Sequence, residues 1–152
     1  VAKAEPFAQG TDVSFENDVA ARKNESKFKA DIKQVTYIDH LDESMALFKS
    51  DKYFEALEYY MHILNYHPSD LNAKFYMGLI YYEQGRYELA LEHFEFVQED
   101  PVTAFDEEAE WYEALSLQKS GYDQAAHDLL IKIKSKKGFY AENASSLLSG
   151  KR

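Results

Sequence analysis

The sequence predicts an all-α fold, an α-α superhelix (solenoid) of three helix pairs with a C-terminal capping helix. Three observations lead to this prediction. Short blocks of sequence recur about every 34 residues, apolar side chains recur at helical spacing within them, and glycine and proline are scarce, with 6 and 3 occurrences among 152 residues. Hydrophobic residues make up 45% of the chain, which excludes the disordered class and allows a sizeable core.

The clearest recurring block begins with a tyrosine and has an alanine three residues later. Its three copies are Tyr53–Tyr60, Tyr87–Phe94 and Tyr122–Leu129. The second copy lies 34 residues after the first, and the third lies 35 residues after the second. In this alignment, the turn before the third copy has lost one residue.

Each block follows a partner segment, and small and large residues alternate between the two. Small residues let paired helices approach closely, and large residues fill the gap to the next unit. The small positions are Ser44, Gly78 and Ala114 in the first helices and Ala56, Ala90 and Ala125 in the second helices. The large positions are Tyr60, Phe94 and Leu129.

These patterns divide the chain into an extension and a repeat domain. The predicted repeats cover about 37–70, 71–104 and 105–137, and a capping helix over 138–149 completes a domain of residues 37–149. Within the repeats we expect helices near 38–50, 53–66, 70–84, 87–99, 104–120 and 122–135. Residues 1–36 carry no repeat and are expected to be partly helical, over Glu16–Gln34, or extended, with Phe7, Val13 and Phe15 as apolar anchors.

The order of small residue, aromatic, alanine, aromatic and closing proline resembles the tetratricopeptide repeat (TPR), which has about 34 residues per unit. The second repeat matches best. Ser44 replaces the usual glycine in the first repeat, and the third repeat lacks a proline equivalent to Pro68 and Pro101. The resemblance implies stacked helix pairs that bind a protein or peptide in a concave groove.

In the resembled family, the first helix of each repeat lines that groove. The corresponding apolar and aromatic residues here are Leu41, Met45, Phe48, Phe75, Leu79, Tyr82, Trp111 and Leu115. Lys49, Glu83, Gln118 and Lys119 complete this groove set, and the rim of the groove is acidic. The Lys, Asn and Arg residues with which some family members hold a C-terminal carboxylate are absent from these positions. The resemblance therefore implies a partner with hydrophobic anchors and basic flanks. An open groove and a groove filled by residues 1–36 are equally compatible with the sequence.

Charge is distributed unevenly along the chain, whose net charge is −10. Residues 37–131 carry five basic and twenty acidic side chains, whereas residues 132–152 carry six basic side chains and one acidic one. An acidic body repels phosphate groups, so nucleic acid is excluded as a partner. The acidic charge has two interpretations, solubility and attraction of a basic partner, and its contrast with the basic end also suggests a homo-oligomer.

No residue pattern indicates an enzyme, a cofactor or a metal site. There is no cysteine, and the five histidines lack the spacing of a metal-binding motif. No apolar run is long enough to span a membrane. Because the chain begins with Val1, we expect that a signal or anchor segment precedes it.

Three functions follow from these features. The first is a non-enzymatic adaptor or scaffold, similar to the soluble domains of membrane-anchored bacterial TPR proteins. This resemblance implies a periplasmic location, with the cytoplasm as the alternative. The second is a chaperone of the type III secretion kind for a hydrophobic client. The third is a self-association module.

Overall fold

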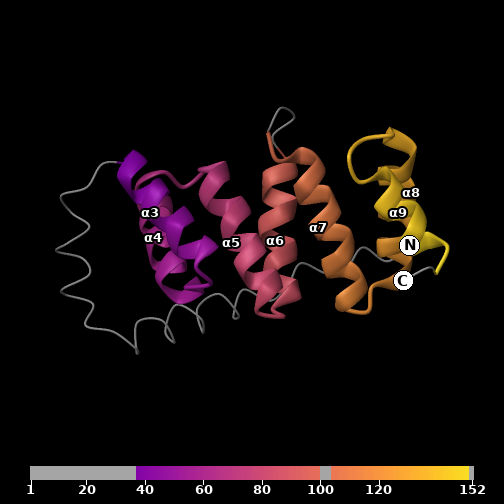
Figure 1. Cartoon of the computed structure of the whole chain (residues 1–152), viewed down its shortest axis with the longest axis horizontal. Helices are drawn as coiled ribbons and strands as arrows, with labels where there is room; N and C mark the ends of the chain where they lie inside the picture. The colour runs from indigo at the N-terminus through magenta and orange to yellow at the C-terminus, as the bar shows by residue number, and fades with distance from the viewer. Residues whose placement is uncertain (1–36, 100–103, 151–152) are drawn as a thin grey trace. The chain divides into compact units, whose positions relative to one another are not determined.

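The computed structural model describes residues 37–99 and 104–150, and over these ranges the protein is helical and contains no β-strand. The helices are α3 (Tyr37–Lys49), α4 (Tyr53–Tyr66), α5 (Leu71–Glu83), α6 (Tyr87–Gln98), α7 (Asp106–Lys119), α8 (Asp123–Lys136) and α9 (Ala141–Leu148) (Figure 1). Their ends agree with the predicted helices to within three residues. The expected helix Glu16–Gln34 and the expected anchors Phe7, Val13 and Phe15 lie outside the described residues.

The chain forms two compact units that divide inside α5, between Ala73 and Lys74. In the first unit, α3 packs on α4. In the second unit, α5 contacts α6 through the rings of Phe75 and Phe94, and then α6 packs on α7, α7 on α8 and α8 on α9. Helices that are neighbours in sequence therefore pack on each other within each unit, as the predicted helical-repeat class requires.

The turns inside the three helix pairs share one backbone conformation. Asp51, Gly85 and Gly121 adopt φ angles of 57°, 74° and 82°, in the left-handed region that glycine enters without strain. In each turn the next residue donates its N–H to the carbonyl five residues earlier: Lys52 to Leu47 at 3.0 Å, Arg86 to Tyr81 at 2.8 Å and Tyr122 to Leu117 at 2.9 Å. These are the bonds of a Schellman helix end, so the pairs are built alike.

This shared turn corrects the predicted alignment of the third repeat. Tyr122 precedes α8 with the backbone conformation that Arg86 has before α6, so it is not the equivalent of Tyr87. Ala126 is buried and Ala125 is exposed, so the small contact residue is Ala126 and the prediction of Ala125 is wrong. The third repeat therefore follows the second at an offset of 36 residues, from Ala90 to Ala126, and no residue is missing from the turn. The recurring tyrosine was misleading because one residue type can precede a helix or begin it.

The other small and large repeat positions are buried as predicted. Ser44, Ala56, Tyr60, Gly78, Ala90, Phe94 and Ala114 all lie in the interior. In the second unit, Gly78 lies so close to Phe94 that a β-carbon on residue 78 would be 2.8 Å from Cε1 of the ring. The large residue of the third repeat is Leu130, which packs with Ala114, whereas the predicted Leu129 is half-buried beside them.

The capping helix α9 buries the apolar end of α7 and α8. Ala144 is fully buried and packs with Leu130 and Ile133, and Leu147 and Leu148 lie against the same group. Without α9 these side chains would be exposed, which agrees with the capping role expected for the last helix of a repeat array.

Candidate protein-binding surface

On α3, in the first unit, the three predicted groove residues lie along one side of the helix. Leu41, Met45 and Phe48 are four and three residues apart, and each is half-buried. The ring of Phe48 lies 5.9 Å from that of Tyr53 at the start of α4. Each side chain keeps part of its surface exposed, so this side of α3 offers apolar contact area.

On α5, in the second unit, Phe75 does not belong to an exposed surface. It is 4% exposed, because its ring stacks on that of Phe105 at 4.4 Å and lies 6.1 Å from that of Phe94. Phe75 is therefore a core residue, contrary to the groove prediction. Phe105, which directly precedes α7, was not identified from the sequence because it stands outside the repeated positions.

The remaining predicted residues of the second unit are Leu79, Tyr82, Trp111 and Leu115, and all four are half-buried. Trp111 is partly covered by the capping region: its ring is parallel to that of Tyr140 within 7°, with the centroids 5.1 Å apart. Tyr140 was not identified as a site residue. The residue before the capping helix thus adds an aromatic side chain to the surface that α5 and α7 were expected to provide.

A second aromatic group joins α5 to α7. The ring of Tyr82 lies 5.3 Å from that of Tyr112 and 5.5 Å from that of Tyr87, in edge-to-face geometry in both cases. Tyr112 also stacks on the buried Phe94 at 5.9 Å. Tyr112 follows Trp111 as Tyr76 follows Phe75, so the sequence did contain a signal: both repeats place a tyrosine one residue after a groove position.

The surroundings of these tyrosines are electronegative. Burial raises the pKa of Tyr82, Tyr112 and Tyr140 above the usual value of 10, and nearby carboxylates raise each pKa further. The carboxylates are Glu83 at Tyr82 and Tyr112, Glu108 at Tyr112 and Tyr140, and Glu107 at Tyr140. A negative field of this kind disfavours ionised phenols and favours a cationic ligand.

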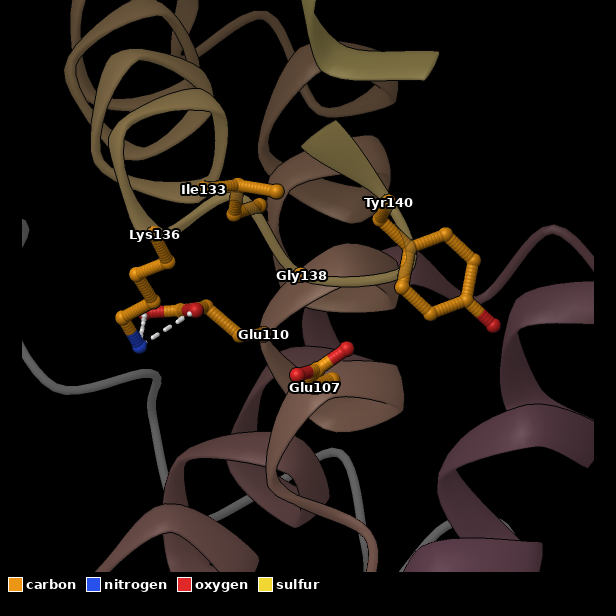
Figure 2. A pocket seen from close by; sticks show the side chains of 6 residues that line it. All are labelled: Glu107, Glu110, Ile133, Lys136, Gly138 and Tyr140. Atoms are coloured by element: carbon orange, nitrogen blue, oxygen red, sulfur yellow. Dashed lines mark hydrogen bonds and ion pairs between the residues drawn. The ribbon is translucent and has the colours of Figure 1, made fainter. Parts of the chain in front are cut away.

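An ion-pair cluster around the buried carboxylate of Glu110 links α7 to α8. The carboxylate of Glu110, whose side chain is 4% exposed, accepts bonds from Lys132 Nζ at 2.8 Å and from Lys136 Nζ at 2.7 Å. Figure 2 shows the Glu110–Lys136 pair in a small hollow that is also lined by Glu107, Ile133, Gly138 and Tyr140. Both lysines are bound to α7, so this part of the basic C-terminal region has a structural role.

Glu113 lies close to this cluster. Burial raises the pKa of its carboxyl group above the usual 4.5, although a hydrogen bond from Gln98 Nε2 opposes the rise, and the negative charges of Glu95 and Glu110 add to it. The groups around Glu113 link α6, α7 and α8.

Two histidines that appear isolated in the sequence meet in the first unit. The rings of His40 on α3 and His62 on α4 are 4.9 Å apart, and that of Tyr66 lies 5.0 Å beyond His62. Burial, followed by the neighbouring His40, lowers the pKa of His62 below its usual 6.5. Only helix packing brings these residues together, since 22 positions separate them.

The described residues contain no group of three or more histidine, aspartate or glutamate side chains placed to hold a metal ion. Over residues 37–99 and 104–150, every helix is too short or too polar to cross a bilayer. No protein-family model matches the sequence, and a search of curated proteins finds no match either.

Proposed function

We propose that this protein is a non-enzymatic scaffold of the tetratricopeptide type that binds a protein or peptide on the apolar and aromatic side of its first helices. The recurrence of one helix hairpin carries the proposal. The same left-handed turn and the same pattern of N–H bonds occur at Asp51, Gly85 and Gly121, with offsets of 34 and 36 residues. Each hairpin of this kind presents side chains at equivalent positions of its first helix.

The equivalent side chains are suited to contact with another protein. Met45, Leu79 and Leu115 occupy the same position in successive first helices, and all three are half-buried. Half-buried apolar and aromatic side chains on rigid helices lose little conformational freedom when they bind, and such residues dominate the energy of many interfaces.

Affinity capture with matched variants tests the proposal. The full chain is immobilised as wild type, as Tyr82→Lys and as Ile131→Lys, and circular dichroism checks that each keeps its helicity. Ile131 is 48% exposed on α8, outside the first helices, so its variant controls for the added charge and the lost apolar surface. We expect Ile131→Lys to retain the captured proteins and Tyr82→Lys to lose them. Equal capture by both variants would contradict the proposal.

A further inference from the structure

An aromatic surface in the second unit extends beyond the repeat positions and is edged by carboxylates. We define the aromatic track as Tyr82, Tyr112, Trp111, Tyr140 and Phe139. Phe139 is 81% exposed, and the other four side chains are half-buried. The track thus combines side chains that helix packing holds in place with one that projects into solvent.

Ring contacts hold the track together. Phe139 meets Tyr140 edge to face at 4.9 Å, and Tyr140 stacks on Trp111 at 5.1 Å. At the other end, Tyr82 contacts Tyr112 at 5.3 Å. Trp111 and Tyr112 are consecutive residues of α7, so both groups of rings are attached to that helix. Rings held by such contacts keep their faces fixed before a ligand arrives.

Carboxylates lie near the tyrosines of the track. The charged groups that shift the pKa of Tyr82, Tyr112 and Tyr140 are Glu83, Glu107 and Glu108. Two lysines of the neighbouring α8, Lys132 and Lys136, are bound to Glu110.

The Glu107 carboxylate is also fixed in position. Its Oε2 accepts the backbone N–H of Phe139 at 2.9 Å, which ties this acid to the exposed end of the track. The combination of aromatic faces and adjacent carboxylates matches the two ways in which a guanidinium group binds. It stacks flat on a ring, and it donates paired hydrogen bonds to a carboxylate.

We propose that the aromatic track, with Glu83, Glu107 and Glu108 beside it, binds an extended, arginine-containing segment of a partner protein. This inference rests on the proposed scaffold function and specifies the chemistry of its partner. Arginine is preferred to lysine because its planar group stacks on aromatic rings and is less strongly hydrated than an ammonium group. An acidic or neutral segment would offer these carboxylates no cationic group.

Trp111 makes the test direct, because it is the single tryptophan of the chain and lies within the track. The full-length protein is titrated with an octapeptide of alternating arginine and glycine while tryptophan fluorescence is recorded. Peptides in which lysine, glutamate or serine replaces arginine serve as comparisons. We expect a saturable change with arginine, weaker binding with lysine and none with glutamate or serine. Binding should also weaken as salt is added, because salt screens the attraction.

Two charge-matched variants locate the site. Glu83→Gln removes a carboxylate beside the track, and Glu88→Gln removes an exposed one on α6. We expect Glu83→Gln and Tyr112→Leu each to weaken arginine-peptide binding by roughly three- to thirtyfold, and Glu88→Gln to leave it unchanged. Equal effects of Glu83→Gln and Glu88→Gln, or equal binding of the arginine and serine peptides, would overturn the proposal.

The occupant is tested by sedimentation at rising protein concentration. A dimer that Glu83→Gln abolishes would place a second copy of this chain on the track, and would overturn the proposal of a different partner. The two proposals also fail separately. If no arginine peptide binds but Tyr82→Lys still loses the proteins captured by the wild type, the arginine inference fails and the scaffold function stands.

Discussion

Substituting Gly78 by alanine tests the close helix contact on which the packing of α5 and α6 depends. The new β-carbon would lie 2.8 Å from Cε1 of Phe94 and 3.1 Å from Cδ1 and Cζ, whereas carbon atoms in contact are usually about 3.5–4.0 Å apart. Phe94 is completely buried, and its ring lies 6.1 Å from that of Phe75 and 5.9 Å from that of Tyr112. The ring therefore cannot move away without displacing these neighbours.

Two opposing terms set the magnitude. Overpacking a core contact costs about 1–3 kcal/mol. Alanine is a better helix former than glycine by about 1 kcal/mol, which offsets part of that cost. We expect Gly78→Ala to lower the free energy of unfolding by about 1 kcal/mol, which lowers Tm by roughly 2–4 °C in a protein of this size. Urea denaturation followed by circular dichroism measures the change.

The third repeat provides the matched control. There the equivalent pair is Ala114 and Leu130. Alanine is larger than the glycine of the second repeat, and leucine is smaller than its phenylalanine. The double variant Gly78→Ala/Phe94→Leu recreates this pair in the second repeat. The free energy of unfolding of the double variant should exceed, by about 1 kcal/mol, the value obtained by adding the effects of the two single variants. A close contact between residues 78 and 94 is refuted if Gly78→Ala stabilises the protein by the full helix-propensity difference of about 1 kcal/mol and shows no coupling to Phe94→Leu.

Three further predictions concern the turns and the titrating groups. Asp51→Gly should raise the free energy of unfolding by roughly 0.5–1 kcal/mol in urea denaturation, because Asp51 has a φ of 57° at a turn where the other helix pairs have glycine. A loss of stability would mean that the exposed hydrogen bond from Tyr53 to Asp51 outweighs this strain. Folding lowers the pKa of His62, so the unfolded chain binds more protons, and the free energy of unfolding should fall as the pH drops through 6.5. His62→Gln should flatten this pH dependence of stability, and an unchanged slope of stability against pH would contradict the prediction. Folding raises the pKa of Glu113 above 4.5, so ionisation of its carboxyl group opposes folding at neutral pH. Glu113→Gln should therefore raise the free energy of unfolding at neutral pH, and this gain should disappear below pH 4.5. A gain that persists in acid would argue against ionisation as the cause.

Much of the fold follows from local sequence because it depends on neighbours along the chain. The helices Tyr53–Tyr66 and Tyr87–Gln98 were predicted with ends correct to within one residue. Their apolar residues recur at helical spacing, and a turn residue with a left-handed backbone precedes each of them. Gly78 and Ala90 were recognised as close-contact positions because a recurring small residue between large ones indicates helices that approach closely.

The candidate surface was only partly predictable, because exposure depends on residues that are distant in sequence. Phe75 and Leu79 lie on the same helix and look alike as groove residues. Phe75 is buried because Phe105 stacks on it, and Phe105 belongs to the turn before the next helix. In the same way, Tyr140 joins the surface only because α9 folds back on α7 and α8.

The sequence by itself determined that the chain forms paired helices, where most of them begin and end, and which small residues allow their contact. These properties depend on helical periodicity and on the backbone preferences of single residues. Only the tertiary structure decided that Ala126 replaces Ala125 at the third contact, that Phe75 is internal, and that His40 meets His62. Each of these features depends on which side of a helix is covered by another part of the chain. That is set by packing between segments that are not adjacent in sequence.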